Sequence, residues 1–182
     1  MIELFAVWQS DEAPLVHLRE AETVTRIKNS PEWQIREESF LAHVQFRVGS
    51  LVLSRHREPV LDFGLSLRSS LDSLALESST ELRFQGTGDR IRFTLAEDQV
   101  EIRANYAKGI AHCSYVDLLR SVLSYMRNSL DVLTAEAPSL LENTFIEYLY
   151  REFLVREIGD EQFSRHSEVM AKIYGAGRSS LD

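Results

Sequence analysis

Three arginines at alternating positions of three short segments are the residues of this sequence whose type and spacing most favour a binding role. Arg83, Arg92 and Arg103 lie in ELRFQ, RIRFTLA and QVEIRANY, each between apolar neighbours. Alternate side chains of a strand share a face, so these arginines would point to the polar side of an antiparallel sheet. Arg47 and His43 alternate in the same way in the upstream segment FLAHVQFRV and are expected on that face. Because guanidinium groups bind carboxylates well, such a face could hold an acidic protein partner.

The arginine pattern also suits two other roles. Cross-strand neutralisation and protection of a sheet against unwanted pairing need charges without any partner. The acidic ends of the chain could also cover the face themselves. Residues 1–39 hold 4 Lys+Arg against 8 Asp+Glu, residues 111–182 hold 7 against 11, and the middle is balanced. All three interpretations remain open at the level of sequence.

The side-chain combinations of common active sites are not found. The string GTGDRI begins like a dinucleotide-binding loop, but Ile91 replaces its third glycine and the loop joins two expected strands. His112 and Cys113 are adjacent, so on a strand they would face opposite ways, and we expect Cys113 to be a buried, inert thiol. Carboxylates of the later helices precede a basic residue by four positions, as in exposed ion pairs. No spacing typical of a metal site occurs among the histidines, which are His17, His43, His56, His112 and His166. We therefore expect no enzyme activity, no metal and no cofactor.

Composition restricts the class of protein and its partners. The chain has 182 residues, 44% of them hydrophobic and 26% charged, as in a globular protein with one main core. A net charge of −8 disfavours nucleic-acid binding, which needs clustered positive charge. A single cysteine, a start without a basic segment, and the lack of any run near the roughly 18 to 20 apolar residues of a membrane span predict a cytoplasmic protein that does not enter a membrane.

The hydrophobic periodicity predicts the elements that position these side chains. Strands are expected at residues 2–8, 15–20, 40–48 and 51–56, with a two-residue turn at Gly49-Ser50, and then in the three arginine-bearing segments. Helices are expected near residues 60–76, 115–134, 140–157 and 160–174. Gly64 is expected where the first of these helices approaches the sheet closely.

These elements predict an α+β fold, in which an antiparallel sheet of a meander and hairpins is covered on one face by helices and the C-terminal region is helical. Residues 1–158 would form one domain, and residues 159–182 would form a short C-terminal helix and a frayed tail.

The order of these elements resembles a family of small proteins. The hairpin FLAHVQFRVGSLVLSRH leads into the helix PVLDFGLSLRSSL, and the strands RIRFTL and QVEIRANY lead into YVDLLRSVLSYMRNSLDVL. This pattern resembles small acidic bacterial immunity-type proteins of polymorphic toxin systems, over roughly residues 38–155. The resemblance implies that the chain binds and neutralises a cognate toxin without chemistry of its own.

Our first hypothesis is therefore a non-catalytic protein-binding module that uses Arg47, Arg83, Arg92, Arg103 and His43. The alternative is an enzyme or small-ligand binder whose site lies in a pocket on the arginine-bearing face. A self-associating subunit is a third hypothesis. The two tryptophans, Trp8 and Trp33, could be interface anchors or core residues.

Overall fold

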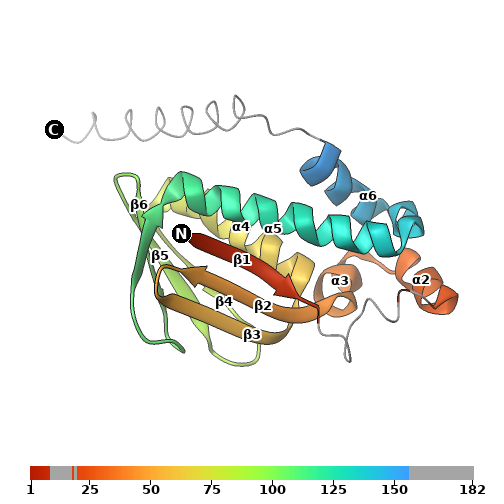
Figure 1. Ribbon diagram of the computed structural model, residues 1–182, viewed down its shortest axis with the longest axis horizontal. Coiled ribbons are helices and arrows are strands. Elements are labelled where there is room, and N and C mark those ends of the chain that lie inside the picture. The colour runs from red at the N-terminus through yellow and green to blue at the C-terminus, as the bar shows by residue number, and fades with distance from the viewer. Residues whose placement is uncertain (9–17, 19, 156–182) are drawn as a thin grey trace.

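The structure is a computed structural model that describes residues 1–8, 18 and 20–155 of the chain (Figure 1). It confirms the α+β class and the antiparallel pairing, but the strands divide into two sheets. The three-stranded sheet has the order β1 (Ile2–Val7), β2 (Leu41–Val48), β3 (Leu51–Pro59). The four-stranded sheet is a meander in which β4 (Ser79–Arg83), β5 (Arg90–Ala96), β6 (Gln99–Ala104) and β7 (Ala111–Ser114) follow one another.

The helices occur at three places in the sequence: between β1 and β2, between the two sheets, and after β7. Short helices α2 (Ala21–Lys28) and α3 (Glu32–Gln34) precede β2, with a π-helical turn η1 (Ile35–Ser39) after α3. The long helix α4 (Val60–Glu77) connects the two sheets, and α5 (Tyr115–Glu136) follows β7. The C-terminal part has a 3₁₀ turn η2 (Pro138–Glu142), α6 (Thr144–Tyr150) and a π-helical turn η3 (Arg151–Val155). The expected strand at residues 15–20 and the expected segment 159–182 fall almost wholly outside the described residues.

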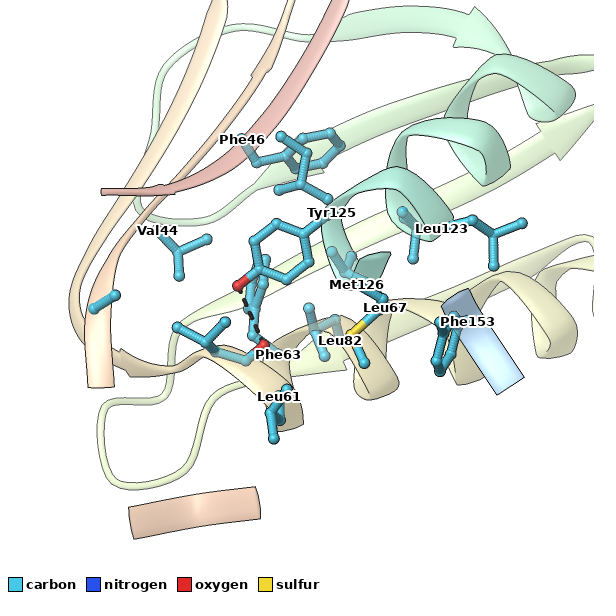
Figure 2. Close-up of a cluster of buried hydrophobic side chains, with 14 of the residues drawn as sticks. Val44, Phe46, Leu61, Phe63, Leu67, Leu82, Leu123, Tyr125, Met126 and Phe153 are labelled. Carbon is cyan, nitrogen blue, oxygen red and sulfur yellow. Dashed lines mark hydrogen bonds between the residues drawn. The ribbon is translucent and has the colours of Figure 1, made fainter. Parts of the chain in front are cut away.

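One hydrophobic core joins both sheets to α4 and α5, which pack side by side (Figure 1). Alternation in β2 places Ala42, Val44, Phe46 and Val48 inward, as the sequence predicts. Figure 2 shows Val44 and Phe46 facing Tyr125 of α5, and the Tyr125 hydroxyl donates a hydrogen bond to the backbone carbonyl of Val60 (3.2 Å). The inner face of each sheet is therefore dry, and the polar residues of the strands are left on the outer faces.

Gly64 marks the close approach of α4 to α5. A Cβ atom added to Gly64 would lie 2.1 Å from Sδ of Met126 and 3.1 Å from the ring of Tyr125. The expectation that Gly64 approaches the sheet is wrong, because the neighbour that demands a glycine here is the other helix.

The helix expected near residues 140–157 begins later than the sequence predicts, at Thr144 of α6. The segment around Ser139 forms η2, and Asn143 caps α6, since its side-chain oxygen accepts hydrogen bonds from the backbone of Phe145 (3.0 Å) and Ile146 (3.3 Å). The same buried amide donates to the carbonyls of Lys28 (2.9 Å) and Ser30 (3.0 Å). Asn143 thus ties the end of α2 to the start of α6, a long-range contact that local patterns do not reveal.

Candidate interaction surface

The outer face of the four-stranded sheet carries an array of four arginines. The strand register places Arg83 of β4 directly opposite Arg90 of β5, and Arg92 of β5 directly opposite Arg103 of β6. Glu81 of β4 lies on the other side of Arg92. Arg83, Arg92 and Arg103 therefore share one face, as the sequence predicts, and Arg90 adds a fourth guanidinium. We call Arg83, Arg90, Arg92 and Arg103 the arginine face.

Two carboxylates partly neutralise the arginine face. Glu81 pairs with Arg83 (Nη2 to Oε2, 3.1 Å) and more loosely with Arg92 (Nε to Oε1, 3.7 Å). Glu101 accepts a hydrogen bond from Arg103 (2.7 Å), and this bond lowers the pKa of Glu101 and raises the pKa of Arg103. The side chains remain largely exposed, at 77% for Arg83, 60% for Arg92 and 55% for Arg103. Cationic groups with this much accessible surface remain available to a partner.

Arg47 and His43 do not share this face. Both lie on β2, on the outer face of the three-stranded sheet, where Arg47 pairs with Glu3 across to β1 (3.4 Å). His43 lies 2.7 Å (Nε2 to Oγ) from Ser54 and 3.0 Å (Nδ1 to Nδ1) from His56 of β3. Partial burial first, and the neighbouring His56 second, lower the pKa of His43. The expected five-residue face is thus split, because α4 separates the two hairpin systems into different sheets.

A β-bulge in β3 changes which residues of that strand face inward. Ala42 pairs with Glu58 and Val44 with Arg55, so His43 alone opposes two residues of β3, and one of these, Arg57, has a positive φ of 54°. The last inward-facing residue of β3 before the bulge is Arg55, and the first inward-facing residue after it is Glu58. An arginine and a glutamate are thereby both directed toward the four-stranded sheet.

Arg55 fastens the two sheets together at this end. Its Nε lies 3.1 Å from Oε1 of Glu58, and its Nη1 bonds Asp89 in the loop between β4 and β5. The guanidinium lies over the ring of Phe84, 4.0 Å from the centroid, a favourable cation–π distance. Burial raises the pKa of Glu58 despite the neighbouring Arg55. This pair was not identified from the sequence, where the only signal is the loss of alternation in SRHREP.

A cleft of about 430 Å³ opens beside this pair. Its walls come from the end of β3, the first turns of α4, the turn η1 and the end of β4, which supplies Leu82 and Arg83. Arg36 and Asp62, which both line the cleft, form a second ion pair (Nη2 to Oδ1, 2.6 Å). The cleft therefore lies between the end of β3, an edge strand of the three-stranded sheet, and the end of β4 in the four-stranded sheet.

The remaining candidate residues lie elsewhere. Trp33 in α3 is 56% exposed, whereas Trp8 packs partly buried against the core. Cys113 is half-buried, and burial raises the pKa of its thiol to about 11, which disfavours the reactive thiolate. Among the described residues, no group of three or more His, Cys, Asp or Glu side chains is arranged to hold a metal ion. Over the same part of the chain, no helix is both long and apolar enough to cross a membrane.

Comparison with known proteins gives no relative from which a role could be transferred. No family model, no curated protein and no solved structure matches this chain.

Proposed function

We propose that this chain is a non-catalytic protein-binding protein of the immunity type, which binds a toxin through the arginine face. The partner would present an acidic surface of similar extent. The proposal is supported by the arrangement of charge on the four-stranded sheet, and the order of elements along the chain agrees with it.

The observation that carries the proposal is the direct opposition of like charges on neighbouring strands. Arg83 faces Arg90 and Arg92 faces Arg103, and like charges in such cross-strand positions destabilise a sheet. A sequence selected only for stability would place acids opposite these arginines. Carboxylates of a partner would relieve the repulsion and gain charge-assisted hydrogen bonds.

A protein partner suits this face better than nucleic acid. The whole chain has a net charge of −8, and the four arginines of the arginine face form only a small cluster of positive charge. Binding to a phosphate backbone draws its affinity from many cationic contacts, and the surrounding acid would repel a long polyanion. An acidic patch on a folded protein needs to contact only the arginines of this face.

Coexpression tests the proposal. The product of the adjacent reading frame is expected to stop bacterial growth, and this chain is expected to restore it and to co-purify with that product. The double variant Arg92→Glu/Arg103→Glu should lose both effects. The matched control Arg120→Glu/Arg151→Glu makes the same change in net charge on exposed helical residues and should keep them. A harmless neighbour, or full rescue by the variant with a reversed face, would contradict the proposal, provided that thermal unfolding shows both variants folded.

The cleft supports a second candidate, a small-ligand binder. Its volume of about 430 Å³ falls in the range of known ligand pockets, roughly 300 to 1,000 Å³. A metabolite that raises the melting temperature of the protein but not of an Arg36→Met variant would favour this candidate. Absence of any such compound from a broad library, together with rescue from a toxin, would favour the first.

A further inference from the structure

The edge strand β4 carries backbone groups that no described element uses. The hydrogen bonds Phe84 N to Asp89 O (3.0 Å) and Leu95 N to Ser78 O (2.8 Å) fix which residues of β4 bond to β5. Hydrogen bonding alternates along an antiparallel pair, so the N–H and C=O groups of Glu81 and Arg83 point away from β5. Within the described residues no hydrogen bond from another element reaches these backbone groups. Such an edge is a template for an added strand.

The cleft gives an added strand space for its inward side chains. Leu82, Arg83 and Phe84 all line the cleft, so a strand laid along the end of β4 would lie at its opening. A side chain opposite Leu82 would point inward, as Leu82 does, toward the apolar part of the lining that includes Phe63. An apolar residue suits that position, because it would be removed from water on binding.

The charge pattern specifies the outward side chain of the added strand. Residues that lie directly opposite one another on neighbouring strands form a row across the sheet. One such row is Glu81, Arg92 and Arg103, so it begins with an acid on β4. In the next row Arg83 faces Arg90, and no acid lies directly opposite either of them. A strand beside β4 would place one of its outward residues opposite Arg83. An aspartate or glutamate there would give the second row the same order as the first, an acid followed by two arginines.

We propose that the partner inserts an extended segment beside β4, which continues the four-stranded sheet with an acid opposite Arg83 and an apolar residue opposite Leu82. This inference rests on the proposed function and names the mode of binding. Recognition by strand addition takes its affinity from backbone hydrogen bonds and its specificity from alternate side chains. The outer face of the four-stranded sheet then continues onto the added strand, whose acid lies beside Arg83.

Selection from a displayed library of random dodecapeptides, with the full chain as bait, tests the proposal. The enriched peptides should alternate acidic and apolar residues, and a synthetic consensus peptide should bind in fluorescence anisotropy. Methylation of its backbone nitrogens at the positions facing β4 should weaken binding at least tenfold, because the pairing hydrogen bonds are lost. Enrichment without alternation, or equal binding of the methylated peptide, would overturn the proposal.

A proline substitution separates the edge of β4 from its charges. Glu81→Pro removes an N–H that faces outward, so it leaves the bonds to β5 in place while it blocks an added strand. The control Glu81→Gln keeps the N–H and removes the same carboxylate. The consensus peptide should bind Glu81→Gln and fail to bind Glu81→Pro, with both variants shown to be folded by circular dichroism. Equal binding of the peptide to Glu81→Pro and Glu81→Gln would contradict strand addition at β4.

The two proposals can fail separately. If charge reversal at Arg92 and Arg103 abolishes toxin binding while Glu81→Pro does not, the arginine face stands and strand addition is wrong. If neither change affects binding, the proposed function itself is wrong.

Discussion

Replacing Gly64 by alanine tests how the two long helices pack. Gly64 is buried in α4, and the added methyl would lie 2.1 Å from Sδ and 3.0 Å from Cγ of Met126. It would also lie 3.1 Å from the ring of Tyr125, whose hydroxyl is held by the carbonyl of Val60. Figure 2 shows Tyr125 and Met126 in the middle of the buried cluster. One of these side chains, or the helix itself, must move.

Two opposing effects set the magnitude. Alanine favours a helix interior over glycine by about 1 kcal/mol. Overpacking a well-filled core costs about 1 to 3 kcal/mol, and Met126 is fully buried, so its sulfur has little free space to enter. We expect Gly64→Ala to lower the free energy of unfolding by about 1 kcal/mol, which for a chain of this size corresponds to a fall in melting temperature of about 2 to 4 °C.

Urea unfolding followed by circular dichroism measures this effect, and a Met126→Ala background isolates its cause. Removing the methionine side chain is itself expected to cost about 2 to 5 kcal/mol. In that background the clash with the Met126 side chain is absent, and the Tyr125 ring can shift into the space left, so Gly64→Ala should raise the free energy of unfolding by about 0.5 to 1 kcal/mol through helix propensity. The exposed substitution Ser69→Ala in the same helix serves as the control for propensity.

The reversal of sign is the decisive result. If Gly64→Ala stabilises the protein with Met126 present, the helices do not approach each other as closely as the structure shows. If the effect is the same in both backgrounds, Met126 is not the neighbour that demands a glycine.

The other predictions concern single side chains. Asn143→Ala should lower the free energy of unfolding by about 2 to 3 kcal/mol, because it removes the cap of α6 and leaves buried carbonyls at the end of α2 unpaired. Denaturant unfolding measures this change, and a loss below about 0.5 kcal/mol would contradict the bridging role of Asn143. The imidazole of His43 should titrate below its ordinary pKa of 6.5 in NMR spectra, and His56→Ala should raise that pKa, whereas an unchanged value would exclude the pairing. A lowered pKa means that the fold favours neutral His43, so this contribution to stability is present above pH 6.5 and is lost as the pH falls through the folded pKa. Cys113 should react with a thiol reagent at pH 8 far more slowly in the native protein than in urea, since its pKa of about 11 leaves little thiolate; equal rates would refute its burial.

Much of the fold follows from local pattern. The alternation in β2 and the turn at Gly49-Ser50, where Gly49 has a positive φ, are predicted by the sequence and present in the structure. These features depend on residues close together in the chain, and short-range sterics and hydrogen bonding decide them. The helix expected near residues 140–157 begins later, at Thr144, because Asn143 caps it while also contacting α2, and a local pattern does not contain that contact.

The outer faces of the two sheets show what the local sequence pattern determined and what the tertiary structure decided. Period-two spacing by itself determined that Arg83, Arg92 and Arg103 share one face, because successive side chains of a strand point to opposite sides. Only the tertiary structure decided that Arg47 and His43 lie on another sheet, and that Arg55 bridges the two sheets. Sheet membership and the β-bulge depend on pairing between segments distant in the sequence, and the free energy of that pairing comes from a core that no local window contains.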